Sequence, residues 1–198
     1  MSNHFNPAFR EFLLALDFIF KWEGGISNEV NDYGGLTNVG ITQDSYETFC
    51  NRLSIPYKSV TELIEEEIVD FYWLDRYIPS GADKLPYPLS LLMFDTSVLF
   101  SVDSSYSFIN EYLYNDPEDY SDKGLEFLLV KLKEGLSPID VAHGICDCRE
   151  KEHRRVTSND NSQDIFLEGW LNRLNDLREI INKYKNKNEH LWRYKMQT

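Results

Sequence analysis

The chain has no long hydrophobic run, little positive charge and few cysteines, and each shortage excludes a class of protein. No stretch of about 18 apolar residues occurs, so we expect no segment to span a membrane. Lys and Arg number 20 against 33 Asp and Glu, which gives a net charge of −13. Nucleic acids and anionic membrane surfaces are bound by concentrated positive charge, so we expect neither as a partner.

The three cysteines do not form a disulfide framework. Cys146 and Cys148 are too close for a relaxed disulfide within a helix, and Cys50 leaves the count odd, so reduced thiols are expected. His143 and His153 flank the later pair and suggest zinc. The spacing H-x2-C-x-C-x4-H matches no regular zinc site, and positions 146 and 148 face apart on a helix. We therefore expect no metal and no cofactor.

Glycine and proline are also scarce, whereas apolar and aromatic residues make up 42% and 14% of the chain. This composition is typical of a folded protein, and 198 residues suffice for one well-buried core, with one compact body as the default. No alternation of strands and helices is visible. The fold class predicted is therefore mainly α, with at most a small β-hairpin.

Helical periodicity and capping residues place most of the elements. Ser59 with Glu62 has the capping-box pattern, and Ser137-Pro138 is a strong helix start. A segment that is apolar nearly all round, Leu89 to Leu99, predicts a buried central helix. Helices are expected at about 9–22, 43–53, 60–77, 89–99, 104–114, 125–132, 139–154 and 164–184, and loops at 79–88, 115–123 and 156–164.

The stretch Trp22 to Thr42 is the part that carries chemistry. Glu23 continues the apolar stripe of the first helix, and Gly24-Gly25 ends that helix because glycine accepts a left-handed conformation. A carboxylic acid on a core-facing position loses water around its charged form, so we expect the pKa of Glu23 to rise and the residue to act as a general acid. The alternative is an exposed carboxylate where the stripe runs out.

A polar loop follows, and glycines at 34, 35 and 40 predict a compact loop or short hairpin. Folding back on the helix end, this loop could bring Asp32 and Thr37 to Glu23, which is the outline of a glycoside hydrolase site. Asp32 would activate water or stabilise positive charge, and Thr37 would position water. Glu29 is a spare carboxylate. Alternatively, Asp32 and Thr37 only bond local backbone groups.

The residues from Glu23 to Thr42, E-G-G-x-x-N-x-x-x-D-x-G-G-x-T-N-x-G-I-T, resemble the signature of the glycoside hydrolase 108 N-acetylmuramidases, the family that includes secretion activator proteins. Glu66 to Tyr77 and Leu92 to Asp95 are similar to two further motifs of that family. The resemblance implies a lysozyme-like helical fold. It also implies cleavage of the bond between N-acetylmuramic acid and N-acetylglucosamine in peptidoglycan, with Glu23 as the acid.

Substrate binding is assigned to five residues in and beyond this stretch: Asn28, Tyr33, Asn38, Trp73 and Tyr77. Aromatic rings offer apolar faces to sugars, although Tyr and Trp at helical spacing also serve as core residues.

Beyond the site stretch, we assign residues 1–102 to a catalytic segment, 103–184 to a helical peptidoglycan-binding segment packed on it, and 185–198 to a charged tail. Phe166 to Leu174 resembles the end of the binding segment joined to the family's catalytic domain. Asp95 is expected to be a buried structural carboxylate bonded to the site loop or to Arg76. Arg173, with Trp170 and Asn172, is expected to lock the last helix against the body.

Two other functions stay open. If Asp32 is structural, a lytic transglycosylase, which needs a single acid and base, becomes credible. Because the family's D-G-x-x-G-x-x-T motif is absent between Tyr112 and Leu136, a non-catalytic wall-binding or secretion-assisting protein is the other alternative.

The site of action is expected to be periplasmic peptidoglycan. No signal peptide is recognisable, so we expect synthesis in the cytoplasm and a holin or secretion apparatus as the export partner. The acidic charge also favours a phage-type or intracellular origin over a freely secreted lysozyme, since many cell walls are themselves anionic.

Overall fold

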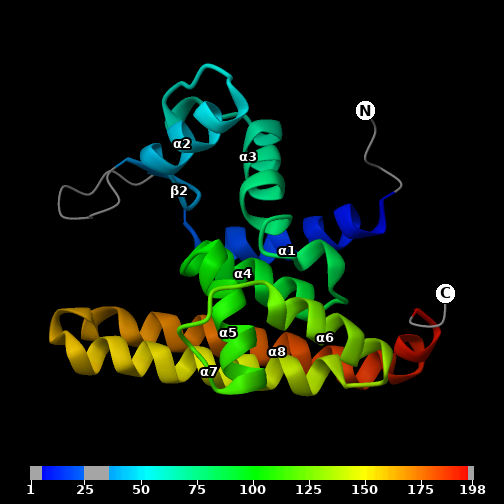
Figure 1. Cartoon of the computed structure of the whole chain (residues 1–198). Helices are drawn as coiled ribbons and strands as arrows, with labels where there is room; N and C mark the ends of the chain where they lie inside the picture. Colours follow the sequence, from blue (N-terminus) through cyan, green and yellow to red (C-terminus); the bar gives the residue numbers. More distant parts are fainter. Residues whose placement is uncertain (1–5, 25–35, 196–198) are drawn as a thin grey trace. The chain divides into compact units, whose positions relative to one another are not determined.

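The computed structural model describes residues 6–24 and 36–195, with side chains up to residue 184 (Figure 1). The chain divides into two compact units, residues 1–79 and 80–198. This division falls earlier than residue 102, where the sequence placed the end of the catalytic segment. The helix at 89–99 is therefore grouped structurally with the later helices.

Within residues 6–24 and 36–79, the first unit contains three α-helices, two short strands and two helical segments of other types. In chain order they are α1 (Pro7–Trp22), β1 (Thr37–Asn38), β2 (Ile41–Thr42), α2 (Gln43–Leu53), the 3-10 helix η2 (Val60–Glu62), α3 (Glu65–Phe71) and the π-helix η3 (Tyr72–Tyr77).

Helix α1 is defined at both ends by its sequence. The Asn6 side chain accepts a hydrogen bond from the Ala8 backbone, and Pro7 occupies the first helical position, where its missing N–H costs nothing. Glu23 is the C-terminal capping residue, and Gly24 follows with φ +51°. The predicted end of the helix at the glycine is thus confirmed.

The β1–β2 hairpin leads directly into α2. Thr37 pairs with Thr42 and Asn38 with Ile41. Thr42 then caps α2, as predicted, by accepting a hydrogen bond from the Ser45 backbone.

The helix predicted from about 60 to 77 is three separate segments. Ile64 is extended and 57% exposed, so its expected core position is wrong. Its backbone N–H donates to the Glu67 carboxylate where the helix restarts at Glu65, whereas Ser59 caps only the short η2, its hydroxyl accepting from the Thr61 backbone. At Tyr72 the helix widens, and Ile78 N–H reaches back five residues to the Trp73 carbonyl.

In the part that the structure describes, all regular elements of the second unit are helices. Its elements are η4 (Ala82–Lys84), α4 (Leu89–Leu99), α5 (Val102–Tyr114), α6 (Lys123–Lys133), α7 (Pro138–Asn159), the 3-10 helix η5 (Asn161–Gln163) and α8 (Asp164–Lys195). Residues 89–97 of α4 are all buried. Helices α5 and α7 both pack on α4, so the prediction of a central buried helix is confirmed for this unit.

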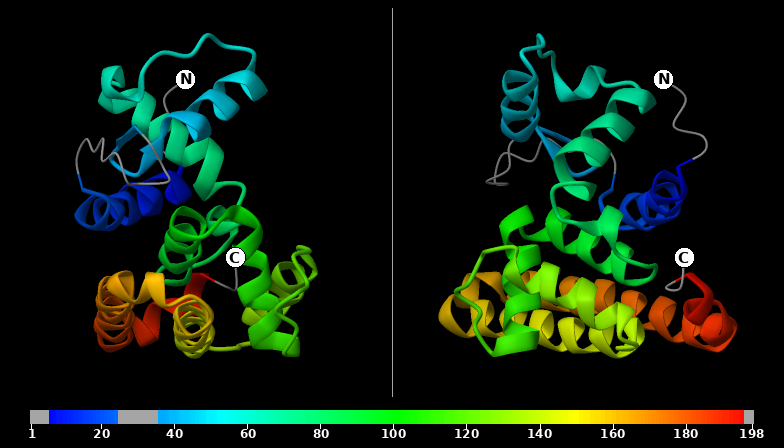
Figure 2. Two further views of the ribbon diagram at one scale, coloured as in Figure 1. Left: turned by 90° about the vertical axis from the view of Figure 1, so that its left-hand side faces the viewer. Right: turned by 45° about the vertical axis from the view of Figure 1, so that its right-hand side comes forward.

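Helices α7 and α8 form a long antiparallel pair joined by η5 (Figures 1 and 2). The loop expected at 156–164 is therefore almost entirely helical. Two of its polar side chains find hydrogen-bond acceptors inside α7: the Thr157 and Ser158 hydroxyls donate to the Arg154 carbonyl, and Thr157 is buried. Helix α8 also continues to Lys195, through most of the segment expected to be a charged tail.

The fold class is mainly α, and the described residues contain a single two-stranded antiparallel sheet, as predicted. None of the described helices has the length and apolarity that a membrane crossing requires.

Candidate active site

Glu23 lies where α1 ends, with its side chain against the turn of the β1–β2 hairpin. It is half-buried. A Cβ built on Gly40 would come within 2.6 Å of Glu23 Oε2 and 2.9 Å of its Cδ. Only glycine leaves room for the carboxyl at this position. The fold therefore brings the end of α1 and the hairpin turn together at Glu23.

The turn itself has an unusual backbone. Val39 and Gly40 both have positive φ, +44° and +82°, which is the requirement of a type I′ hairpin turn. Gly40 adopts this region without strain. Val39 is β-branched, and such residues are rarely found at positive φ, so the surrounding contacts must hold it there.

Two hydrogen bonds tie the hairpin to elements outside it. The Tyr72 hydroxyl donates to the Val39 carbonyl at 2.5 Å, and the Asn38 amide donates to the Val60 carbonyl at 2.8 Å. Asn38 is only 8% exposed. Its amide thus anchors the turn to η2, and the structure argues against the substrate contact predicted for it.

Thr37 begins β1, in register with Thr42, and is half-buried. It therefore lies on the same hairpin as the turn that contacts Glu23. Its predicted role in positioning water stays a prediction.

The two aromatic residues predicted to bind sugars belong to an aromatic cluster. The Trp73 and Tyr77 rings are stacked, with centroids 5.2 Å apart, and the Phe12 ring meets both edge-on. Tyr77 is completely buried, whereas Trp73 is half-buried. A buried ring cannot stack on a sugar, so the structure places Tyr77 in the core and leaves Trp73 as the candidate.

Three of the predicted site residues, Asn28, Asp32 and Tyr33, lie outside the described residues, as does Glu29. Their predicted roles stay predictions.

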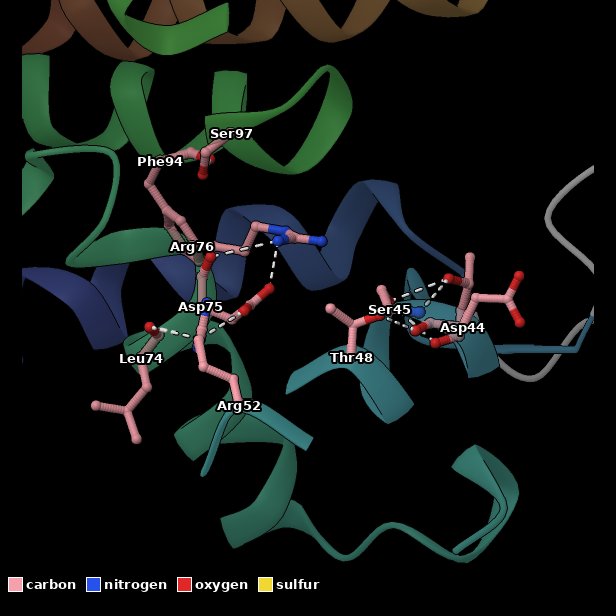
Figure 3. A network of polar contacts seen from close by, with 10 residues as sticks. Asp44, Ser45, Thr48, Arg52, Leu74, Asp75, Arg76, Phe94 and Ser97 are labelled. Atoms are coloured by element: carbon pink, nitrogen blue, oxygen red, sulfur yellow. Dashed lines mark hydrogen bonds and ion pairs between the residues drawn. The ribbon is translucent and has the colours of Figure 1, made fainter. Parts of the chain in front are cut away.

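One polar cluster of this unit has no clear sequence signal. Asp75, 8% exposed, accepts a hydrogen bond at 2.7 Å from Arg52 of α2 and is also paired with its neighbour Arg76 (Figure 3). This cluster ties α2 to η3. Within this unit Arg76 is thus paired with Asp75.

Asp95 is buried as predicted, but its partners come from the last two helices. Arg149 of α7 contacts one carboxylate oxygen at 2.9 Å, and Arg173 of α8 contacts the other at 2.8 Å. The sequence predicted the site loop or Arg76 as the partner of Asp95; within the second unit its partners are these two arginines, and most of the site loop lies outside the described residues. The prediction that Arg173 locks the last helix is confirmed within the second unit.

The His and Cys residues of α7 do not converge on a metal site. Within the described ranges, no group of three or more His, Cys, Asp or Glu could hold a metal ion. Burial raises the pKa of the Cys146 thiol to about 12, His143 pairs with Asn182 at 3.0 Å, and His153 is stacked between the Phe100 and Trp170 rings.

A helical fold with a carboxylate at the end of its first helix, facing a small hairpin, is the arrangement expected of a lysozyme-like protein, and the comparisons with known proteins agree. Residues 16–100 match the model of the family Glycosyl hydrolase 108, which confirms the resemblance read from the sequence over that segment. The matched segment contains the whole of the Glu23 to Thr42 stretch.

The solved structure of Brucella abortus SagA is similar in fold to this chain. The TM-score is 0.71 at 19% sequence identity, over 92% of this chain and 99% of that one. No curated protein matches the chain.

Proposed function

We propose that the protein is a glycoside hydrolase of peptidoglycan that cleaves the β-1,4 bond between N-acetylmuramic acid and N-acetylglucosamine. The match to Glycosyl hydrolase 108 supports a glycosidase acting on this polymer. The observation that carries the proposal is the position of Glu23, whose carboxyl lies against the glycine of the hairpin turn.

In this mechanism Glu23 donates a proton to the glycosidic oxygen while positive charge develops on the departing sugar. A proton donor must hold its direction towards the bond being broken. The end of α1 fixes the Glu23 backbone, since its N–H donates to the Ile19 carbonyl at 2.9 Å, and the close approach of Gly40 limits where the carboxyl can lie. Asp32 as helper and Thr37 as the residue that positions water complete the proposal.

Purified protein incubated with peptidoglycan should release new reducing ends, and Glu23→Gln should lower that rate by about 10²-fold or more, the usual contribution of a general acid. Glu66→Gln is a matched control, because Glu66 is an exposed carboxylate on α3 of the same unit. It should behave as the wild type. A Glu23→Gln variant with full activity would overturn the proposal.

The products distinguish the neighbouring functions. Hydrolysis adds a water, so the new end is reducible muramic acid, whereas transglycosylation leaves the lighter anhydro sugar. Mass spectrometry before and after borohydride reduction separates the two and identifies the sugar at the new end. A wall-binding protein without catalytic activity would produce neither end, and its binding would survive Glu23→Gln.

A further inference from the structure

From its contacts we infer that Tyr72 is the positioning residue that keeps the hairpin turn at the Glu23 carboxyl; this inference rests on the proposed function. Tyr72 is 1% exposed and begins the π-helix η3. Tyr72 is distant in sequence from both Glu23 and Gly40, and only the fold brings it to the turn and to the helix that hold them.

The hairpin cannot maintain this turn by its own strands. Each strand has two residues, and a ladder of this length is marginal without support from the rest of the fold. In addition, the turn contains Val39 at φ +44°, a conformation that disfavours a β-branched side chain. An external contact must therefore keep the turn in its shape.

Tyr72 supplies such a contact at the strained residue itself. Its hydroxyl donates to the carbonyl of Val39, the residue that directly precedes Gly40. Any relaxation of Val39 would move Gly40, and Gly40 is the backbone against which the Glu23 carboxyl lies.

The Tyr72 ring also contacts the helix that carries the acid. Its centroid is 6.2 Å from that of Phe20, at an interplanar angle of 68°. Phe20 lies three residues before Glu23 on α1, which is about one helical turn. One buried side chain therefore touches both elements that define the position of the proton donor, the end of α1 and the hairpin turn.

Tyr72→Phe tests this role, because it removes only the hydroxyl and keeps the ring next to Phe20. A displacement of about 1 Å in a catalytic group can lower the rate on the order of 10²-fold. We expect kcat on soluble peptidoglycan fragments to fall by about 10- to 100-fold while KM changes by less than about twofold, since Tyr72 is buried away from substrate.

Tyr46→Phe is the matched control. Tyr46 is 5% exposed, lies on α2 of the same unit, packs on Phe49 and Phe71, and is hydrogen-bonded to Cys50 of its own helix. The same loss of a buried hydroxyl there should leave kcat unchanged. Circular dichroism checks that both variants are folded.

A rescue variant separates positioning from general stability. Asn-Gly is the sequence that most strongly favours a type I′ turn, so Val39→Asn should set the turn without help from the hydroxyl. The double variant Tyr72→Phe with Val39→Asn should regain most of the wild-type kcat. If Tyr72→Phe alone does not fold, the kcat of the double variant tests the inference in its place.

Three results would overturn the inference: a wild-type kcat in Tyr72→Phe, a rise in KM at constant kcat, or a double variant whose kcat stays as low as that of Tyr72→Phe. Failure of the proposed function looks different, because it would appear as full activity in Glu23→Gln or as no hydrolysis by the wild type.

Discussion

At the scale of single residues, the candidate site depends on Gly40, a residue without a side chain. Gly40 has no Cβ, and that space is filled by the Glu23 carboxyl. Glycine here serves two needs at once, a backbone at φ +82° and the close approach of an acid. At Gly24, in contrast, an added Cβ would meet no atom of the described residues within 4 Å, and the positive φ of +51° suits the end of the helix.

Gly40→Ala should therefore damage activity more than stability. The new methyl group would displace the Glu23 carboxyl, and we expect kcat to fall by about 10²-fold, as for other misplaced catalytic groups. Activity assays and denaturant unfolding measured on the same preparation check this expectation.

Gly135→Ala provides the control for backbone strain. Gly135 also has positive φ, +103°, but no atom of the described part of the chain lies within 4 Å of the added Cβ. This variant should lose stability, by about 1 kcal/mol, and keep its kcat. Equal losses of kcat in the two variants would show that the clash with Glu23 is irrelevant.

For two residues the burial predicted from helical periodicity is wrong. The Tyr77 ring, which was predicted to bind sugars, is buried. The Ile64 side chain, which helical periodicity over 60–77 places in the core, is 57% exposed. A change from α-helix to π-helix at Tyr72 and a break before Glu65 alter the direction of every side chain between them. Periodicity assumes one uninterrupted helix, and here that assumption fails.

At the scale of elements, one buried carboxylate connects three helices of the second unit. Asp95 of α4 is paired with Arg149 of α7 and Arg173 of α8, and Asp95 and Arg149 are completely buried. The Arg149 guanidinium also donates to Thr96 at 3.2 Å. Without Asp95, two buried guanidinium groups would lose the carboxylate that pairs with them.

Asp95→Asn should accordingly destabilise the protein by about 3–5 kcal/mol, the range for breaking a buried ion pair. Guanidinium unfolding followed by circular dichroism measures the loss. Glu179→Gln is the same chemical change at an exposed pair, since Glu179 and Lys183 have 67% and 72% of their side-chain surface exposed. Its effect should stay below about 1 kcal/mol. Similar losses in both variants would contradict the structural role of Asp95.

The sequence identified most helices because their signals are local. The Ser137-Pro138 pair begins its helix where predicted, and Thr42 caps the helix predicted at 43–53. The boundary at 156–164 could not be predicted, since the polar residues there are stabilised by the packing of α7 on α8. Charge partners such as Asp95 with Arg149 are 54 residues apart, and no periodic pattern connects them.

At the scale of the whole molecule, the chain is strongly acidic, yet one buried histidine is kept neutral at pH 7. His153 is 2% exposed and stacked between Phe100 and Trp170. Burial, together with the nearby Arg149 charge, lowers the pKa of His153 to about 4. In the unfolded chain the same group titrates near its ordinary value of 6.5.

Between these two values the unfolded chain binds more protons than the folded protein, so stability falls as the pH is lowered from about 6.5 to about 4. His153→Phe keeps an aromatic ring in the stack and removes the titration. We expect its unfolding midpoint to depend less on pH over this window than that of the wild type, as measured by denaturant unfolding at several pH values. Parallel curves for the two proteins would refute the prediction.

The sequence by itself determined the class of the fold, the family resemblance, the end of the first helix at Gly24 and the choice of Glu23, because caps, glycines and apolar spacing act over a few residues. Only the tertiary structure decided which groups meet. It places Gly40 at the acid, Tyr72 on Val39 of the turn, Asn38 on Val60 and two arginines on Asp95. Such contacts join residues distant in sequence, and they form only when burial of the core has fixed the helices that carry them.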